Sequence, residues 1–189
     1  MIIGIVGGSG VGKTTVVNMI YNKTHSYIID ADKIGHELLL KNGLAYNEVV
    51  EHFGSTILDS DQNIIRKSLG NIVFQNKSEL AVLNQITHPK ILAQTKSILN
   101  NLDQSKYDFI IIDSALLYEI GLDSLVDLTI AVYASSDIRA RRLMARNNLS
   151  YDDALARINS QKTSYKSDYS IFNESDLVQL EEQIDKFLN

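Results

Sequence analysis

The sequence contains no cysteine, and it has one proline. Without cysteine the chain can form no disulfide, no thiolate metal site and no cysteine nucleophile. The proline, Pro89, stands at the start of a helical pattern, where its missing N–H group costs nothing. These absences leave the compartment open, but they remove disulfide scaffolds and thiol chemistry from consideration.

Long apolar runs are absent as well. No window approaches the roughly 18 consecutive apolar residues that a membrane-spanning helix needs. The opening stretch MIIGIVGGSG has neither the basic region nor the long apolar region of a secretory signal, because glycines interrupt its apolar run. We therefore expect a cytoplasmic protein with no membrane partner.

The chain also lacks an excess of basic residues. Its formal net charge is -5, whereas a general nucleic-acid binder draws most of its affinity from a basic surface. We expect small-molecule rather than nucleic-acid partners. The chain has 189 residues, of which 44% are hydrophobic, and this is typical of one globular domain with a substantial core.

Short runs rich in isoleucine and valine predict five buried strands of a largely parallel sheet. They lie at residues 2–6, 27–29, 109–112, 128–132 and, more weakly, 169–172. Helical periodicity occurs at residues 14–21, 33–41, 44–52, 66–74, 78–86, 89–99, 136–147, 151–160 and 176–188. This alternation predicts an α/β fold in which helices flank a parallel five-stranded sheet.

The gap between the second and third strands, residues 30–108, is too long for one crossover and contains only helical patterns. We interpret it as an inserted helical region that covers a substrate. The predicted organisation is a single domain in three parts. These are a nucleotide-binding core (about 1–31, 107–135 and 168–189), a helical substrate-binding region (about 32–106) and a lid (about 136–167).

The stretch GGSGVGKT matches the phosphate-loop pattern G-x-x-x-x-G-K-[ST], with a predicted strand before it and a helix after it. Backbone N–H groups of such a loop, together with the positive end of the following helix, bind phosphate oxygens. Lys13 would reach the terminal phosphates of ATP, and the Thr14 hydroxyl would complete a Mg²⁺ shell. The predicted ATP-binding residues of the loop are Gly8, Gly10, Val11, Gly12, Lys13, Thr14 and Thr15.

A dinucleotide fold is the alternative interpretation of these glycines. Gly8 and Gly10, with Asp30 further on, imitate its G-x-G-x-x-G spacing and acidic residue. The third glycine of that pattern would fall on Lys13, so the dinucleotide interpretation fails.

Carboxylates that follow the predicted strands are candidates for the base and the metal ligands. If the backbone stays extended through Ala31, Asp30 and Asp32 share one face at the carboxyl end of a strand, where open α/β sheets bind ligands. Either one could instead cap the helix that begins near Lys33. Asp113 ends the run FIIID, at the position of an acid that holds Mg²⁺ through water. The equal alternative is that Asp113 is an ordinary loop aspartate.

Basic residues gather in the C-terminal third of the chain. Arg139, Arg142 and Arg146 follow an i, i+3, i+7 spacing, so on a helix they form one stripe. A solvated surface face is the ordinary explanation. In small phosphate-loop kinases a pair of basic helices closes over ATP as a lid, and the closed lid excludes water. We favour this lid role for Arg142 and Arg146, and less strongly for Arg139 and Arg141.

The motifs together resemble the dephospho-CoA kinase family over nearly the whole chain. The resemblance is carried, in order, by GGSGVGKT, IIDADKIG, HFG, IIRKSLGNIVF, HPKI, SALLYE, RRLMAR, RINSQ and SDYSIFN. The family implies transfer of the ATP γ-phosphoryl group to the 3′-hydroxyl of dephospho-coenzyme A with Mg²⁺, the last step of coenzyme A synthesis. It also implies a phosphate-loop core, a helical substrate region and a lid.

Residue roles follow from that resemblance. Asp32, the second acid of the DAD motif, is implied as the general base, with Lys13 and Arg142 beside it in catalysis. The implied substrate-binding residues are Asp32, Arg66, His88, Pro89, Arg157 and Gln161, and the implied Mg²⁺ ligands are Thr14, Asp30 and Asp113, partly through water.

The chain departs from the family pattern at four places. Ala115 stands where the family usually has proline, Asn147 where it has aspartate, Ser167 where it has alanine, and Gln62 where it has a turn glycine. None removes a group that phosphoryl transfer requires. A kinase of another small acceptor, such as a nucleoside, nucleotide or sugar, and an ATP-binding regulator without kinase activity remain the alternative functions.

Overall fold

The computed structural model describes residues 1–162, 164–174 and 176–189. The chain forms two compact units, one made of Met1–Ile29 with Asp103–Asn189 and the other of Asp30–Leu102. The three-part division into core, substrate region and lid stays a prediction.

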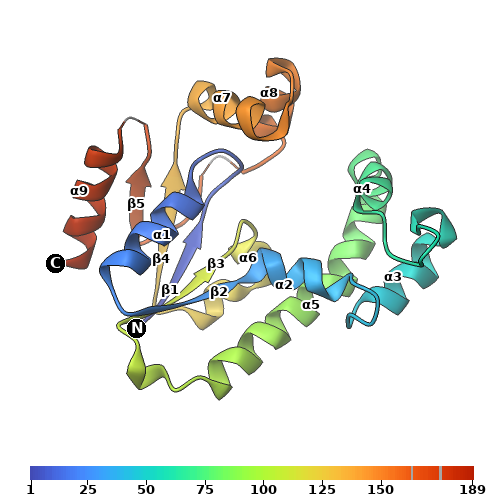
Figure 1. Cartoon of the computed structure of the whole chain (residues 1–189), viewed down its shortest axis with the longest axis horizontal. Coiled ribbons are helices and arrows are strands. Elements are labelled where there is room, and N and C mark those ends of the chain that lie inside the picture. The colour runs from blue at the N-terminus through green and yellow to red at the C-terminus, as the bar shows by residue number, and fades with distance from the viewer. Residues whose placement is uncertain (163, 175) are drawn as a thin grey trace. The chain divides into compact units, whose positions relative to one another are not determined.

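A five-stranded parallel sheet carries the fold, with the strand order β2-β3-β1-β4-β5 (Figure 1). The strands are β1 (Ile2–Val6), β2 (Ser26–Asp30), β3 (Phe109–Asp113), β4 (Leu128–Tyr133) and β5 (Tyr169–Phe172). Strand β1 lies parallel to both β3 and β4, with Ile5 opposite Asp113 and Val6 opposite Ala131. The predicted fold class is confirmed, and the register aligns the carboxyl ends of these strands at one edge.

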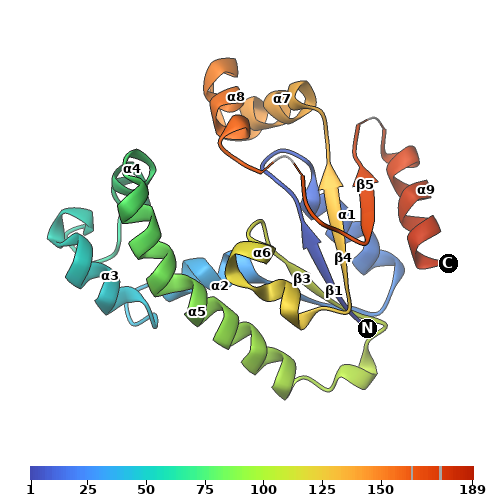
Figure 2. The same cartoon turned by 180° about the vertical axis from the view of Figure 1, so that it is seen from behind.

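The two faces of the sheet are covered by different helices (Figures 1 and 2). Helices α1 (Lys13–Lys23) and α9 (Leu177–Leu188) pack against each other, and their apolar sides join Ile3 and Ile5 of β1 in one buried core. On the opposite face lie α6 (Leu117–Ile120) and the 3-10 helix η3 (Leu122–Leu125). Gly4 faces them, and a Cβ there would lie 2.9 Å from the Leu117 side chain. The sheet is therefore buried on both sides, which explains its unbroken apolar strands.

Helices α7 (Ser136–Asn147) and α8 (Tyr151–Asn159) form an antiparallel pair with a small core of its own, made of Ala140, Leu143, Ala154 and Ile158. Asn148 ends α7 in the left-handed conformation with φ 53°, as asparagine at a helix C-terminus commonly does. The Ser150 hydroxyl then caps α8 by accepting from the Asp153 N–H at 3.1 Å. Both helices begin where the sequence predicts.

The second unit is built mainly from helices, with one isolated antiparallel bridge between Leu58 and Ile64. It comprises α2 (Ala31–Leu38), α3 (Tyr46–Phe53), the short η1 (Ser55–Ile57), α4 (Arg66–Gln75) and α5 (Lys77–Asn101). Ion pairs and hydrogen bonds tie these helices together: Lys90 lies 2.9 Å from Glu48, and the Arg66 guanidinium lies 2.7 Å from the His36 ring. A further 3-10 turn, η2 (Gln104–Lys106), precedes β3 in the first unit.

The structure differs from the sequence expectations in three places. Residues 78–86 and 89–99 belong to one continuous helix, α5, so Pro89 lies inside a helix rather than at its start. An internal proline costs about 3 kcal/mol, and the apolar side of α5, which buries Ile91 and Leu99, compensates for that cost. Ala31 is the first residue of α2, so the backbone is not extended between Asp30 and Asp32. Helix α6, a single turn, has no periodicity that could predict it.

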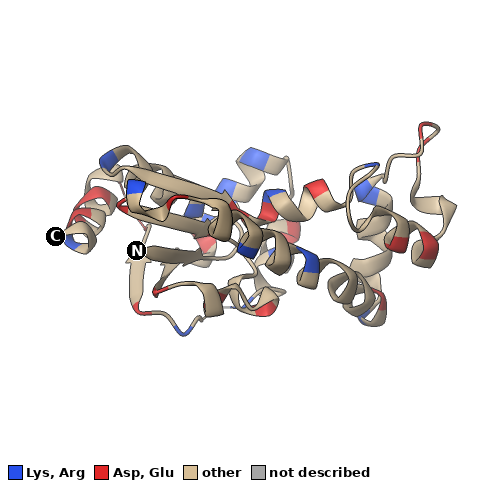
Figure 3. Cartoon of the chain, turned by 90° about the horizontal axis from the view of Figure 1, so that it is seen from below, with Lys and Arg blue, Asp and Glu red and all other residues tan. Residues whose placement is uncertain are grey.

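Acidic residues lie along α9, where they are coloured red in Figure 3. Lys23 at the end of α1 pairs with two of them, Glu181 at 2.7 Å and Asp185 at 2.8 Å. Within the described residues, no helix combines the length and the apolar character needed to cross a bilayer.

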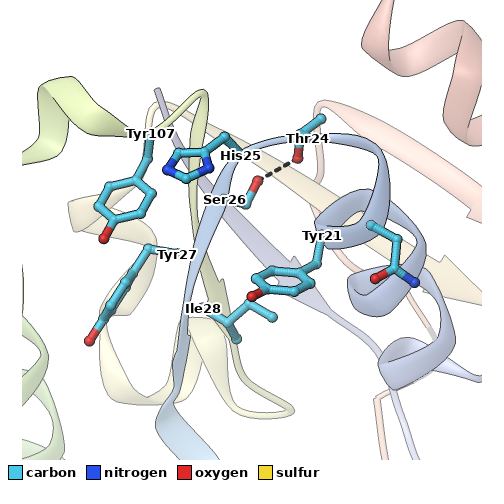
Figure 4. A pocket seen from close by; sticks show the side chains of 8 residues that line it. Tyr21, Thr24, His25, Ser26, Tyr27, Ile28 and Tyr107 are labelled. Carbon is cyan, nitrogen blue, oxygen red and sulfur yellow. Dashed lines mark hydrogen bonds between the residues drawn. The ribbon is translucent and has the colours of Figure 1, made fainter.

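An open pocket with an aromatic lining lies at the amino ends of β2 and β3 (Figure 4). The His25 and Tyr107 rings stack with centroids 5.2 Å apart, and Tyr27 lies tilted 5.5 Å from Tyr107. Because the glycine loop follows the carboxyl end of β1, this pocket belongs to the opposite edge of the parallel sheet.

Candidate active site

The glycine loop joins β1 to α1 and has the backbone that its sequence predicts. Gly10 and Gly12 take φ values of 82° and 88°, which side chains rarely tolerate. Val11 between them is 3% exposed and anchors the loop in the core. In α1, whose residues are all described, no side chain caps the N-terminus and the first turn carries no acidic residue. The amide end of the helix is thus suited to an external anion.

A lysine and an aspartate meet beside the loop. Lys13 begins α1 and its ammonium forms an ion pair with the carboxylate of Asp113, the last residue of β3. Both side chains are 12% exposed, so water screens the pair only weakly. The register that places Asp113 opposite Ile5 brings this carboxylate to the loop. A positive and a negative group therefore lie at the carboxyl edge of the sheet, where open α/β sheets bind ligands.

The α7 arginines reach the loop from the other side. Arg142 donates to the carbonyls of Gly10 at 3.2 Å and Val11 at 3.1 Å. It also donates to the backbone carbonyl and the side-chain oxygen of Asn173, at 3.2 and 3.1 Å. The Asn173 side chain in turn donates to the Val11 carbonyl at 2.9 Å. Arg142 and Asn173 therefore fix the backbone of the loop.

The other arginines of α7 differ in exposure. Arg139 is 6% exposed, and burial lowers the pKa of its guanidinium. Arg146 is exposed and donates to the Asn147 side chain at 3.0 Å. Arg141 is exposed and pairs with Asp137 at 2.9 Å. The stripe therefore begins buried at the loop and ends in solvent.

Gln161 and Arg157 sit at the far end of this helical pair. The Gln161 side chain accepts from the Ser9 N–H at 2.8 Å and donates to the Ser9 hydroxyl at 2.9 Å. Arg157, in the last turn of α8, is exposed. Of these two predicted substrate-binding residues, one contacts the glycine loop of this chain and the other faces solvent.

The remaining predicted residues lie in the helical unit. Asp30 caps α2 by accepting from the Lys33 N–H at 2.8 Å, so the capping alternative holds for this residue. Asp32 lies in the first turn of α2, and Arg66 begins α4. His88 and Pro89 lie in the interior of α5. Their roles toward a substrate stay predictions.

Two contributors to the loop were not assigned from the sequence: Ser9 and Asn173. Asn173 is 5% exposed and directly follows β5. A polar residue at the carboxyl end of a buried parallel strand was the signal that could have identified it. Ser9 carried no such signal, because its contacts come from residues far away in the sequence.

Four features together define a phosphate-loop kinase: the parallel sheet, the glycine loop between β1 and α1, the Lys13–Asp113 pair and the basic helix pair. Comparisons with known proteins show to which family of these kinases the chain belongs. The family model described as dephospho-CoA kinase matches residues 1–179. A dephospho-CoA kinase from Carboxydothermus hydrogenoformans is 44% identical over 160 residues, which cover 85% of this chain and 77% of that protein. This chain belongs to the dephospho-CoA kinase family.

Solved structures agree with that assignment. The dephospho-CoA kinase from Campylobacter jejuni superposes with a TM-score of 0.69 at 29% identity, over 99% of this chain and 94% of the other. A shikimate kinase from Bacteroides thetaiotaomicron, at 15% identity and a TM-score of 0.53 over 99% and 96% of the two chains, shares the fold alone. The chain is accordingly an ATP-dependent kinase.

Proposed function

We propose that this chain transfers the γ-phosphoryl group of ATP to the 3′-hydroxyl of dephospho-coenzyme A, giving coenzyme A and ADP. The observation that carries the proposal is the uncapped N-terminus of α1 behind a loop with two left-handed glycines, in a chain of this family. The amides of Gly8 and of residues 10–15 would bind the phosphates of ATP, and the Lys13 ammonium would neutralise charge on the transferring group.

The donor set beside the loop suits a magnesium ion. The Thr14 hydroxyl and the Asp113 carboxylate are hard oxygen ligands, which Mg²⁺ prefers. When bound, the ion would neutralise phosphate charge and orient the β- and γ-oxygens. Asp113 would hold the ion through water while its carboxylate keeps Lys13 in place. Asp30 is a weaker candidate ligand, because its carboxylate already accepts a backbone N–H.

Asp32 is the proposed general base. It is the second acid of the DAD motif, in the first turn of α2. A carboxylate that takes the proton of the hydroxyl group being phosphorylated typically contributes about 10²–10⁴-fold to the rate. Arg142 would contribute positive charge beside the loop, since its guanidinium is held there by four hydrogen bonds. Arg146 is exposed and would approach the phosphates only with ATP bound. Arg157, which is exposed as well, would contact the acceptor.

The implied acceptor site lies in the helical unit. Arg66, His88 and Pro89 would contact dephospho-coenzyme A, and Arg66 is oriented by its contact with His36. A guanidinium suits the phosphate groups of this acceptor, because it can donate two parallel hydrogen bonds.

The test of the base is the Asp32→Asn variant in an ADP-release assay with dephospho-coenzyme A. We expect kcat to fall by about 10²-fold or more while the KM for ATP stays within about threefold. Asp61→Asn, an exposed aspartate of the same unit, is the matched control and should keep wild-type turnover. A near-wild-type kcat for Asp32→Asn would show that the base is another group.

A further inference from the structure

Ser9, in the middle of the glycine loop, has three polar atoms held by two distant side chains. Its carbonyl accepts from the Arg139 Nε at 2.9 Å. Its N–H donates to the Gln161 Oε1 at 2.8 Å, and its hydroxyl accepts from the Gln161 Nε2 at 2.9 Å. Arg139 also donates to the Gln161 Oε1 at 2.9 Å, which closes the ring of contacts.

These contacts join parts of the chain far apart in sequence. Ser9 and Gln161 are separated by 152 positions, and Ser9 and Arg139 by 130. Arg139 comes from the first turns of α7, and Gln161 follows the end of α8. Both ends of the helical pair therefore hold the same loop residue.

The burial of Arg139 is costly and needs an explanation. A buried guanidinium is normally paired with a carboxylate, whereas this one, within the described part of the chain, hydrogen-bonds to the neutral oxygens of Ser9 and Gln161. Among the described residues its positive charge therefore has no carboxylate partner, and it lies directly beside a loop built for phosphate.

The glycines fit the same arrangement. A Cβ at Gly8 would lie 2.6 Å from an Arg139 guanidinium nitrogen and 2.9 Å from the Gln161 Oε1. A Cβ at Gly10 would lie 2.7 Å from the Arg139 carbonyl oxygen. Gly8 and Gly10 therefore admit residues of this chain as well as the phosphates of a nucleotide.

We propose that Arg139 and Gln161 are positioning residues, which hold Ser9 and thereby keep the glycine loop in its phosphate-binding shape. They would set the affinity for the nucleotide through the loop, without touching the acceptor. This inference rests on the proposed role of the loop as the ATP site. It assigns Gln161 to the nucleotide side of the reaction, whereas the family resemblance implies a substrate contact.

The test is a double-mutant cycle of Gln161→Leu and Arg139→Met, with MgADP binding measured by calorimetry. Each single variant should weaken MgADP binding by about tenfold, because each removes hydrogen bonds to Ser9. Since both act on one residue, the double variant should lose only about 10–20-fold, rather than the product of about 100-fold. Arg141→Met, an exposed arginine of the same helix, is the matched control and should bind as the wild type does.

Steady-state kinetics separate positioning from the alternatives. We expect the Gln161→Leu variant to raise the KM for ATP and to leave the KM for dephospho-coenzyme A within about twofold. A raised KM for the acceptor with unchanged MgADP affinity would overturn the proposal in favour of a substrate contact. A lowered Tm with unchanged MgADP affinity, or a loss of about 100-fold in the double variant, would overturn it as well. If Arg139→Met does not fold, Arg139→Lys keeps the charge and takes its place in the cycle.

The same measurements distinguish this inference from the proposed function. If the wild type binds MgADP but does not phosphorylate dephospho-coenzyme A, the proposed function fails while the binding cycle still tests the two positioning residues. If the wild type turns over and all variants bind MgADP equally, only the positioning inference fails.

Discussion

The buried hydroxyl of Thr95 should lower the free energy of unfolding relative to a protein with an apolar side chain at this position. The side chain lies in α5 and is 0% exposed, and within the described residues its hydroxyl has no hydrogen-bond partner. An unsatisfied buried hydroxyl costs about 1–3 kcal/mol. Thr95→Val replaces the hydroxyl with a methyl group of nearly the same size, so no cavity forms.

We therefore expect Thr95→Val to raise the free energy of unfolding by about 2 kcal/mol. For a chain of this length each kcal/mol corresponds to roughly 2–4 °C in Tm, so the expected gain is about 4–8 °C. Urea unfolding followed by far-UV circular dichroism measures the free energy, and a thermal melt measures the Tm.

The same helix provides a matched control in Thr87. It is 8% exposed, but its hydroxyl donates to the Leu83 carbonyl at 2.8 Å. Thr87→Val removes a hydrogen bond that is made, so it should leave stability unchanged or lower it by up to about 1 kcal/mol. If both variants change stability equally, or if Thr95→Val is the less stable one, the reasoning from the unsatisfied hydroxyl is refuted.

Three further predictions follow from other contacts. Asn173→Ala removes a hydrogen bond to the Val11 carbonyl and one from Arg142, and should lower the free energy of unfolding in urea by about 2–3 kcal/mol; a change below about 0.5 kcal/mol would contradict it. Gln62 has a φ of 65° where the family has a turn glycine. Gln62→Gly should therefore relieve backbone strain, raising the free energy of unfolding by about 0.5–1 kcal/mol and the Tm slightly. A clear loss of stability would show that the turn is unstrained. The hydrogen bonds from the Thr129 N–H and hydroxyl lower the pKa of Asp168. Their stabilisation is present above the unfolded pKa of about 3.9 and is lost as the pH falls below it, so Asp168→Asn should be less stable than wild type at pH 7 and equal to it near pH 2. A stability difference that does not depend on pH would exclude this cause.

Much of the fold could be predicted because its signals are local. Each strand is a short apolar run, and the loop, its two left-handed glycines and the start of α1 follow from one motif. The break placed before Pro89 shows where local rules fail. A proline usually ends a helical pattern, but here the packing of a long helix outweighs its cost.

The candidate site was predictable where residues are close in sequence and unpredictable where they are not. Lys13 and Thr14 follow directly from the loop motif, and Asp113 from the end of a strand. The capping of α2 by Asp30 had to be left open, because an acid after a strand can equally hold a metal or a helix N-terminus. The contacts of Arg139 and Gln161 with Ser9 depend on tertiary packing, which one sequence without its fold does not specify.

The proposed activity is phosphorylation of the 3′-hydroxyl of dephospho-coenzyme A by ATP. It can be tested by incubating the purified protein with MgATP and a panel of acceptors, with tandem mass spectrometry of each product. We expect coenzyme A carrying its new phosphate at the 3′ position, and no comparable product from nucleosides, nucleotides or sugars. Preferred phosphorylation of another acceptor, or ATP binding without acceptor-stimulated ADP release, would contradict it.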